Sequence, residues 1–310
     1  MTTNTSLLIF GPSGQVGTEL RRLAPQATFL NRTKADLSDP DACAAAIREY
    51  NPRAVINAAA WTAVDAAETH EDDATVINGT TPTAIANTCA ALGIPLVHIS
   101  TDYVFDGAGD APFTTTHPTG PLGAYGRSKL VGENGVRAAG GSHVILRTSW
   151  VFSAHGANFL KTMLRLGGER ETLSVVADQI GGPTPARDIA SACLAIAKQL
   201  TTSPEKSGTY HFSGAPDVSW AEFARAIMAE AGLSCAITDI PTSAYPTPAR
   251  RPANSRLDCQ TLEIFGLERP DWRLGVEDTV TDMLTSALPS SQYSALRTRS
   301  LQGSAGWNPL

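Results

Sequence analysis

The sequence predicts a doubly wound α/β protein with a parallel sheet and a smaller, mixed α/β lobe. Two observations support this fold class. Short apolar runs alternate with segments of helical periodicity through the first 150 residues, and Pro- and Gly-rich breaks interrupt this rhythm afterwards. Strands that alternate with helices form right-handed βαβ units and hence a parallel sheet. The length of 310 residues, 42% of them hydrophobic, is enough for one large domain or two of moderate size.

Each element of the first half follows from a local pattern. Apolar runs bounded by turn residues predict strands at 6–10, 27–30, 54–56, 95–99 and 143–146. Helical spacing of apolar residues and helix start or stop residues predict helices at 15–23, 39–50, 81–92 and 125–137. Asp39-Pro40 is typical of a helix start and Gly93 of a helix end. Two further helices are expected at 188–199 and 220–231.

A glycine-rich turn follows the first strand and opens the first helix. Gly11, Gly14 and Gly17 lie in the string G-P-S-G-Q-V-G. Residues without a Cβ let backbone N–H groups approach a pyrophosphate at the positive end of a helix. The place of this turn in the first βα unit favours a dinucleotide over a simple tight turn. Asn31 and Arg32 end the second strand without the acid that binds the ribose of NAD, which favours NADPH, with NADH as the alternative.

A tyrosine and a lysine four residues apart indicate proton chemistry. Tyr125 and Lys129 lie in Y-G-R-S-K at the start of a predicted helix, where this spacing puts both on one face. Because an ammonium favours a nearby phenolate, we expect Lys129 to lower the pKa of Tyr125. Thr101 ends the fourth strand, at the edge where ligands bind in parallel sheets. The three side chains can converge, with Thr101 polarising a carbonyl and Tyr125 donating a proton.

These motifs predict how the chain is divided. Residues 1–150, with a returning segment of about 170–200, are expected to form a dinucleotide-binding domain. Residues of about 151–170 and 201–288 are expected to form a substrate domain. The segment 289–310, rich in Ser, Gly and polar residues, is expected to be a flexible tail.

The sequence resembles the extended branch of the short-chain dehydrogenase/reductase superfamily and, within it, the dTDP-4-dehydrorhamnose reductase family. Six strings carry the resemblance: G-P-S-G-Q-V-G-T-E-L (11–20), N-A-A-A-W-T-A-V-D-A-A-E (57–68), S-T-D-Y-V-F-D-G (100–107), Y-G-R-S-K (125–129), R-T-S-W-V-F (147–152) and Y-P-T-P-A-R-R-P-A-N-S-R-L (245–257). It runs from about residue 7 to 283, and the last string is the most specific. It implies a Rossmann-type sheet and NADPH-dependent reduction of the C4 keto group of dTDP-4-dehydro-L-rhamnose to dTDP-L-rhamnose.

The resemblance also implies roles for individual residues. The cofactor site would comprise the glycine turn with Gln15 and Val16, then Asn31, Arg32, Asp36 and Leu37 near the adenosine, and Ala60, Trp61, Thr62 and Ile99 near the nicotinamide. Thr101, Asp102, Tyr103 and Trp150 would meet the sugar, Tyr125 would donate the proton, and Lys129 would hold the nicotinamide ribose.

The diphosphate and base of a nucleotide-sugar need their own ligands. Arg250, Arg251 and Arg256 fall within seven residues of a proline-stiffened segment, and their planar guanidinium groups suit phosphate oxygens. Asn158 is a candidate for holding the pyrimidine. These four residues complete the predicted substrate site.

Composition and charge limit the partners. A net charge of -6 without a basic cluster argues against nucleic acid and an anionic membrane surface, and no apolar run reaches the length of a membrane span. Five scattered cysteines predict a reducing, cytoplasmic location without a disulfide framework. Some members of the family dimerise through a magnesium site made by glutamates. Glu19 matches one of these, but Arg187 stands where another would be, so a metal-bridged dimer is not expected, and the chain is either a monomer or a homodimer.

Two alternative functions remain open. One is another nucleotide-sugar reductase or epimerase of the same family; a dehydratase is disfavoured because Tyr103 follows Thr101-Asp102 where dehydratases commonly carry Glu. The other is a non-catalytic, NADP-binding regulatory subunit resembling that of methionine adenosyltransferase.

Two other polar features are interpreted as structural. The acids Glu68, Glu71, Asp72 and Asp73 form a charge run that is expected to be a solvated loop. His98 lies inside the fourth predicted strand, where a buried imidazole with satisfied hydrogen bonds is expected.

Overall fold

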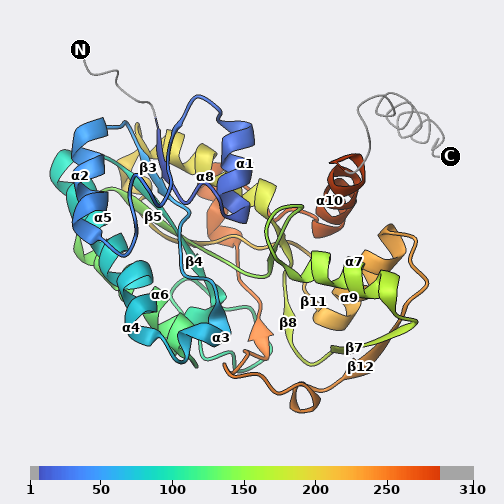
Figure 1. Cartoon of the computed structure of the whole chain (residues 1–310). Coiled ribbons are helices and arrows are strands. Elements are labelled where there is room, and N and C mark those ends of the chain that lie inside the picture. The colour runs from blue at the N-terminus through green and yellow to red at the C-terminus, as the bar shows by residue number, and fades with distance from the viewer. Residues whose placement is uncertain (1–6, 287–310) are drawn as a thin grey trace.

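A six-stranded parallel sheet forms the centre of the computed structural model, which describes residues 7–286 (Figure 1). The strand order is β10-β5-β4-β3-β1-β2, and every neighbouring pair is parallel. The bounds of the strands are β1 Leu8–Phe10, β2 Thr28–Leu30, β3 Val55–Asn57, β4 Leu96–Thr101, β5 His143–Thr148 and β10 Gly208–His211. The predicted doubly wound α/β fold is therefore confirmed.

Helices cover both faces of this sheet. Successive side chains of a strand point to opposite faces, so a fully buried strand feeds two cores. Ile9 of β1 packs with α1 and α8, whereas Leu8 and Phe10 pack with α2, α5 and α6. The bounds of these helices are α1 Gln15–Leu23, α8 Ala186–Leu200, α2 Pro40–Tyr50, α5 Thr81–Leu92 and α6 Ala124–Ala138. Short elements complete this part: α3 Val64–Ala67, α4 Glu71–Thr75, the π-helical turn η1 Val76–Thr80 and the 3₁₀ turn η2 Asp102–Val104.

The helix ends follow the signals in the sequence. The Asp39 carboxylate accepts a hydrogen bond from Ala42 N at 2.9 Å, which caps α2, and Pro40 is its first residue. Helix α5 ends at Gly93, whose φ of +67° is the left-handed conformation that favours glycine.

A smaller lobe packs around a core of its own, which contains Phe152, Phe223 and Trp272. Its helices are α7 Phe159–Glu169, α9 Trp220–Glu230 and α10 Trp272–Ser286, which lie to one side of the large sheet in Figure 1. Its strands are β6 Val151–Phe152, β7 Thr172–Val176, β8 Ile180–Gly181, β9 Thr184–Pro185, β11 Val218–Ser219, β12 Ala236–Ile240 and β13 Asn254–Ser255. They form three small sheets: β7 with β12, β6 with β9, and β11-β8-β13. Three 3₁₀ turns, η3 Pro204–Lys206, η4 Thr242–Ala244 and η5 Gln260–Phe265, complete the described elements.

The boundary between the lobes differs from the predicted one at two strands. Strand β10 pairs with β5 at the edge of the large sheet, although residues 201–288 were expected in the substrate domain. Strand β7 pairs with β12 in the small lobe, although residues 170–200 were expected to return to the large sheet. Helix α8, which belongs to the same range, does pack on the large sheet as expected. Both strands are short, so their patterns do not reveal their partners. The expected tail at 289–310 lies outside the described residues.

No helix in the described part of the chain is long and apolar enough to cross a membrane.

Candidate active site

A cavity of about 670 Å³ lies where the carboxyl ends of β1, β3, β4 and β5 meet the small lobe. Ligands bind at this edge in parallel α/β sheets. The cavity brings together almost all of the predicted cofactor residues: Gly11, Gly14, Gln15, Val16, Asn31, Arg32, Asp36, Leu37, Ala60, Trp61, Thr62, Ile99, Tyr125 and Lys129. Of the predicted substrate residues it includes Thr101, Asp102, Tyr103 and Trp150.

The glycine turn is shaped by close backbone contacts. Gly11 has a φ of +82°, and a Cβ there would lie 2.6 Å from Ala59 Cα. Gly17 does not line the cavity; a Cβ at this position would lie 1.9 Å from Gly11 O, so this glycine lets α1 pack on the turn. Among the described residues, no side chain caps α1 at Gly14. The amides of its first turn are therefore open to an anion, and this donor set fits a pyrophosphate.

A guanidinium lies at the adenosine end of the cavity. Arg32 is exposed, and its Nε is 3.7 Å from Asp36 Oδ2. Asn31 Oδ1 accepts hydrogen bonds from Thr33 Oγ1 at 2.7 Å and Lys34 N at 3.2 Å, so Asn31 shapes the turn after β2. The exposed cation fits a 2′-phosphate better than it fits a ribose hydroxyl.

Thr101 and Tyr125 meet at the end of β4. Thr101 Oγ1 donates to Asp102 Oδ1 at 3.0 Å and accepts from Tyr103 N at 3.2 Å. Burial raises the pKa of Tyr125, the Thr101 hydroxyl lowers it, and the Asp102 carboxylate raises it further. The net pKa lies above the usual value, so the expectation that Lys129 lowers it was wrong, because burial outweighs the stabilising contacts. A phenol that stays protonated across neutral pH is suited to donate a proton.

Lys129 lies beneath the same cavity and is 2% exposed. Its Nζ donates to Ile99 O at 2.7 Å and lies 3.5 Å from His98 Nε2. Burial lowers the pKa of Lys129 to about 8, although the Glu133 carboxylate acts to raise it. Burial and the Lys129 charge hold the pKa of His98 well below its usual value, so this imidazole is neutral. His98 Nδ1 lies 3.2 Å from Asn57 Nδ2, which confirms a satisfied, buried histidine.

A buried ion pair that the sequence did not reveal supports these residues. Glu133 of α6 is fully buried and accepts from Arg147 Nε at 2.8 Å and Nη2 at 2.7 Å. It also accepts from Ser100 Oγ and from Arg137 Nη2, both at 2.6 Å. Burial raises the pKa of Glu133, but the guanidinium of Arg147 brings it below its usual value. The charged pair fixes α6, which carries Tyr125 and Lys129, to β4 and β5.

The acidic run also fixes the start of α6. Glu68 Oε1 accepts from Ala124 N at 2.9 Å, and Glu71 binds Arg127 through two hydrogen bonds of 2.7 Å. Glu71 lies on α4 and Glu68 directly follows α3, so the expectation of a loop was wrong. Asp72 and Asp73, also on α4, are exposed to solvent as expected. The partners lie 56 residues away in the sequence, and local pattern could not show them.

Trp150 contributes an aromatic wall from the small lobe. Its φ is +49°, and its ring stacks on Trp220 with centroids 3.6 Å apart. A Cβ at Gly181 would lie 2.8 Å from Trp150 Cε2, so the indole packs in close contact with the backbone of Gly181. The position of the ring in the cavity fits the predicted contact with a sugar.

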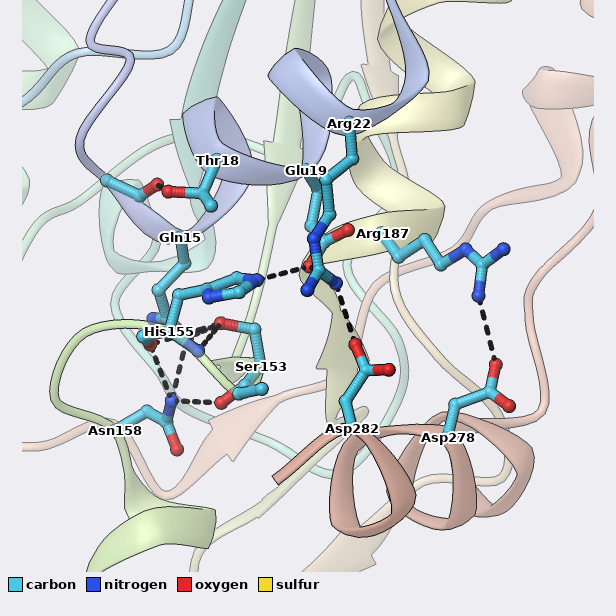
Figure 2. Close-up of polar contacts among 12 residues, drawn as sticks. Gln15, Thr18, Glu19, Arg22, Ser153, His155, Asn158, Arg187, Asp278 and Asp282 are labelled. Carbon is cyan, nitrogen blue, oxygen red and sulfur yellow. Dashed lines mark hydrogen bonds and ion pairs between the residues drawn. The ribbon is translucent and has the colours of Figure 1, made fainter. Parts of the chain in front are cut away.

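Asn158 lies in a network that joins the lobes. Its Nδ2 donates to Gln15 Oε1 at 2.9 Å and to Ser153 O at 2.8 Å (Figure 2). Its Oδ1 accepts from Lys161 N at 3.1 Å. The cavity, as residues 7–286 define it, does not include Asn158. The structure therefore gives the amide a structural use and does not bring it to the predicted base site.

The three predicted arginines also lie outside the cavity lining that the described residues provide. Arg250 is exposed, and Arg256 Nη1 donates to Asn254 Oδ1 at 3.1 Å. Arg251 Nη2 pairs with Asp65 Oδ2 at 2.7 Å. The charge of Arg251 lowers the pKa of Tyr103, so this arginine lies near the substrate end of the cavity.

The residues around Glu19 do not fit a magnesium ion. A hydrogen bond and two ion pairs connect α1, α8, α10 and the 153–158 loop here: His155 Nε2 lies 2.9 Å from Glu19 Oε1, and Arg22 pairs with Asp282 at 2.7 Å and Arg187 with Asp278 at 3.5 Å (Figure 2). Guanidinium groups thus lie among the carboxylates, whereas Mg²⁺ needs oxygen ligands free of such cations. Residues 7–286 contain no group of three or more His, Cys, Asp or Glu side chains that could hold a metal.

The fold and the site together define a class of protein. A nucleotide-binding sheet whose cavity also presents a buried phenol, hydroxyl and ammonium is the architecture of the extended short-chain dehydrogenases/reductases. The family model described as RmlD substrate binding domain matches residues 5–285. The dTDP-4-dehydrorhamnose reductase of Burkholderia thailandensis is 47% identical over 295 residues, which cover 90% of this chain and 99% of that protein. The chain belongs to the dTDP-4-dehydrorhamnose reductase family.

Solved structures agree with this assignment. The dTDP-4-dehydrorhamnose reductase of Bacillus anthracis, solved in complex with NADP, has a TM-score of 0.83 and 34% identity, covering 90% of this chain and 100% of that one. The UDP-glucose 4-epimerase of Thermus thermophilus has a TM-score of 0.75 but only 19% identity, covering 91% of this chain and 100% of that one, and so shares the fold alone.

Proposed function

We propose that this chain reduces the C4 keto group of dTDP-4-dehydro-L-rhamnose to dTDP-L-rhamnose with NADPH. The convergence of Thr101, Tyr125 and Lys129 in one cavity with the glycine turn carries this proposal. Membership of the reductase family supports it, as does the relative that was solved with NADP.

The residues of the large sheet would hold the cofactor. The amides that follow Gly14 meet the pyrophosphate, Arg32 meets the 2′-phosphate, and Asp36 with Leu37 meets the adenine. Lys129 reaches the nicotinamide ribose from α6. When bound, the cofactor supplies the hydride that reduces the carbonyl carbon.

Tyr125 supplies the proton in this reaction. Its raised pKa keeps the phenol protonated at neutral pH, so it donates to the carbonyl oxygen as negative charge develops there. To hydrogen-bond the same oxygen, the Thr101 hydroxyl turns away from Asp102, to which it donates in the structure, while Asp102 and Trp150 meet the sugar. The resulting phenolate lies in a buried site that disfavours its charge, and so it readily recovers a proton from solvent.

The arginine segment remains our candidate for the diphosphate. Arg251 already neutralises Asp65 and acts on Tyr103 at the rim of the substrate end. Arg250 and Arg256, which lie on the same short segment, would supply the further positive charge that a diphosphate needs.

Nicotinamide absorbance tests the proposed reaction. We expect the purified protein to oxidise NADPH in the presence of dTDP-4-dehydro-L-rhamnose and to form one dTDP-L-rhamnose for each NADPH consumed. A faster reaction with a UDP-linked 4-keto sugar would assign a different substrate. Binding of NADPH without turnover of any 4-keto sugar would overturn the proposal in favour of a non-catalytic subunit.

A further inference from the structure

The side chain of Gln15 reaches from the large lobe to a loop of the small lobe. Gln15 is the first residue of α1 and directly follows the glycine turn. Its Oε1 accepts from Asn158 Nδ2 at 2.9 Å, as Figure 2 shows, and its Nε2 lies 3.4 Å from Val151 O, to which it donates. The side-chain amide therefore serves the 153–158 loop, whereas the backbone amide of the same residue stays free for the pyrophosphate.

Glu19 makes a second contact with this loop, one turn further along α1. Residues four apart share a face of a helix, so Gln15 and Glu19 both point toward the loop. His155 Nε2 lies 2.9 Å from Glu19 Oε1, and because a carboxylate only accepts, the imidazole donates here. Glu19 is 5% exposed, which shields this hydrogen bond from water. The loop is thus held to α1 at two points (Figure 2).

Hydrogen bonds inside the loop carry these two contacts toward its tip. Asn158 Nδ2 also donates to Ser153 O at 2.8 Å, and Ser153 Oγ accepts from His155 N at 3.1 Å. The one proton of Ser153 Oγ can go to Gln15 Oε1 at 2.9 Å or to His155 O at 3.1 Å. Gly156 then turns the chain with a φ of +63°. The shape of the loop therefore depends on the same side chains that hold it to α1.

The tip of the loop lines the cofactor end of the cavity. Gly156 and Ala157 belong to the cavity lining, together with the glycine turn. A Cβ at Gly156 would lie 3.6 Å from Gln15 Cγ, so the tip lies against the start of α1. In the part of the chain that the structure describes, His155 and Asn158 do not line the cavity. Any effect of these two side chains on a bound cofactor therefore passes through the loop.

We propose that Gln15, His155 and Asn158 are positioning residues for the dinucleotide: they hold the 153–158 loop to α1, so that its tip covers the glycine turn. This inference rests on the cofactor of the proposed function and not on the sugar. A loop that is already ordered spares the cofactor the entropic cost of ordering it on binding. The contacts with α1 therefore increase the affinity for NADPH and slow its release.

The test is the rate of NADPH release, measured by stopped-flow fluorescence of the nicotinamide with no sugar present. Asn158→Ser keeps an oxygen that can cap α7 but removes the donor to Gln15, and His155→Ala removes the donor to Glu19. We expect each variant to raise both the release rate and the dissociation constant for NADPH about fivefold, the effect of one hydrogen bond.

Thr162→Ala is the matched control for these variants. The Thr162 hydroxyl donates to Asn158 O at 3.0 Å, at the start of α7, and its loss should leave NADPH release unchanged. A merely structural role of His155 and Asn158 would lower the free energy of unfolding in urea and leave the release rate as it is in the parent protein. That result would overturn the inference.

A double-mutant cycle tests whether Asn158 acts through Gln15. Gln15→Ala alone should speed release at least as much as Asn158→Ser does, and Asn158→Ser should add little in the Gln15→Ala protein. An equal increase in both backgrounds would overturn the inference, because the Gln15 side chain would then act on the cofactor independently of the loop. A parent protein that does not bind NADPH would refute both the proposed function and this inference. Binding and release as expected, without turnover of any 4-keto sugar, would refute the proposed reaction and support this inference.

Discussion

Asp102 offers a prediction in which stability and activity change in opposite directions. Asp102→Asn removes a buried charge at almost constant volume. In the folded protein the pKa of Asp102 is about 6, against 3.8 for an unperturbed aspartate. Since one pKa unit corresponds to about 1.4 kcal/mol, the ionised carboxylate destabilises the fold by up to about 3 kcal/mol at neutral pH.

The sign of this effect follows from proton binding. The folded state binds the proton of Asp102 more tightly than the unfolded state does, so stability falls as pH rises from about 4 to about 6 and stays low above that. We therefore expect Asp102→Asn to be more stable by up to about 3 kcal/mol at pH 8, or about 4 °C in Tm for a chain of this length, and by about half as much at pH 5. Its kcat/KM should fall.

Urea denaturation of both proteins at pH 8 and pH 5, beside steady-state kinetics, is the assay for this prediction. A variant that is less stable than the parent at pH 8 would refute the reasoning, because it would mean that the carboxylate stabilises the fold. An advantage of equal size at both pH values would show that it does not arise from the titration of Asp102.

Two further predictions concern the cofactor and the scaffold. Arg32→Ala should lower the ratio of kcat/KM for NADPH to that for NADH about tenfold, measured from initial rates with each cofactor, because the guanidinium meets the 2′-phosphate; an unchanged ratio would contradict this role. Glu133→Gln should lower the free energy of unfolding by about 3–5 kcal/mol, because it leaves Arg147 buried without its counter-charge. The control Glu169→Gln, which breaks the exposed pair with Arg165, should change the free energy of unfolding by less than about 0.5 kcal/mol. If the two variants lost equal stability in urea denaturation, burial of the Glu133–Arg147 pair would not be the cause.

Local pattern predicted the nucleotide-binding half of the fold well. The helix expected at 15–23 is α1 to the residue, and the helix expected at 81–92 is α5, because apolar spacing and a terminal glycine define both locally. The strand ends then follow from the topology of a parallel sheet. For this reason the sequence alone predicts that Thr101, Tyr125 and Lys129 converge, and the structure places all three in the lining of one cavity.

Contacts between distant segments could not be predicted in this way. Arg251 and Asp65 lie 186 residues apart in the sequence, so the arginine segment suggested a phosphate site but gave no sign of its carboxylate partner. Glu133 looks like any helical glutamate until the fold sets Arg147 beside it. The two-residue strands β8 and β13 show no periodicity, and so give no sign of their pairing.

Single-turnover oxidation of NADPH by Tyr125→Phe, with dTDP-4-dehydro-L-rhamnose in excess, tests the central claim most directly. The variant lacks only the phenolic hydroxyl, so we predict an unchanged dissociation constant for NADPH and a rate that is about 10²–10⁴ times lower. A rate close to that of the parent protein would contradict the role of Tyr125 as the proton donor.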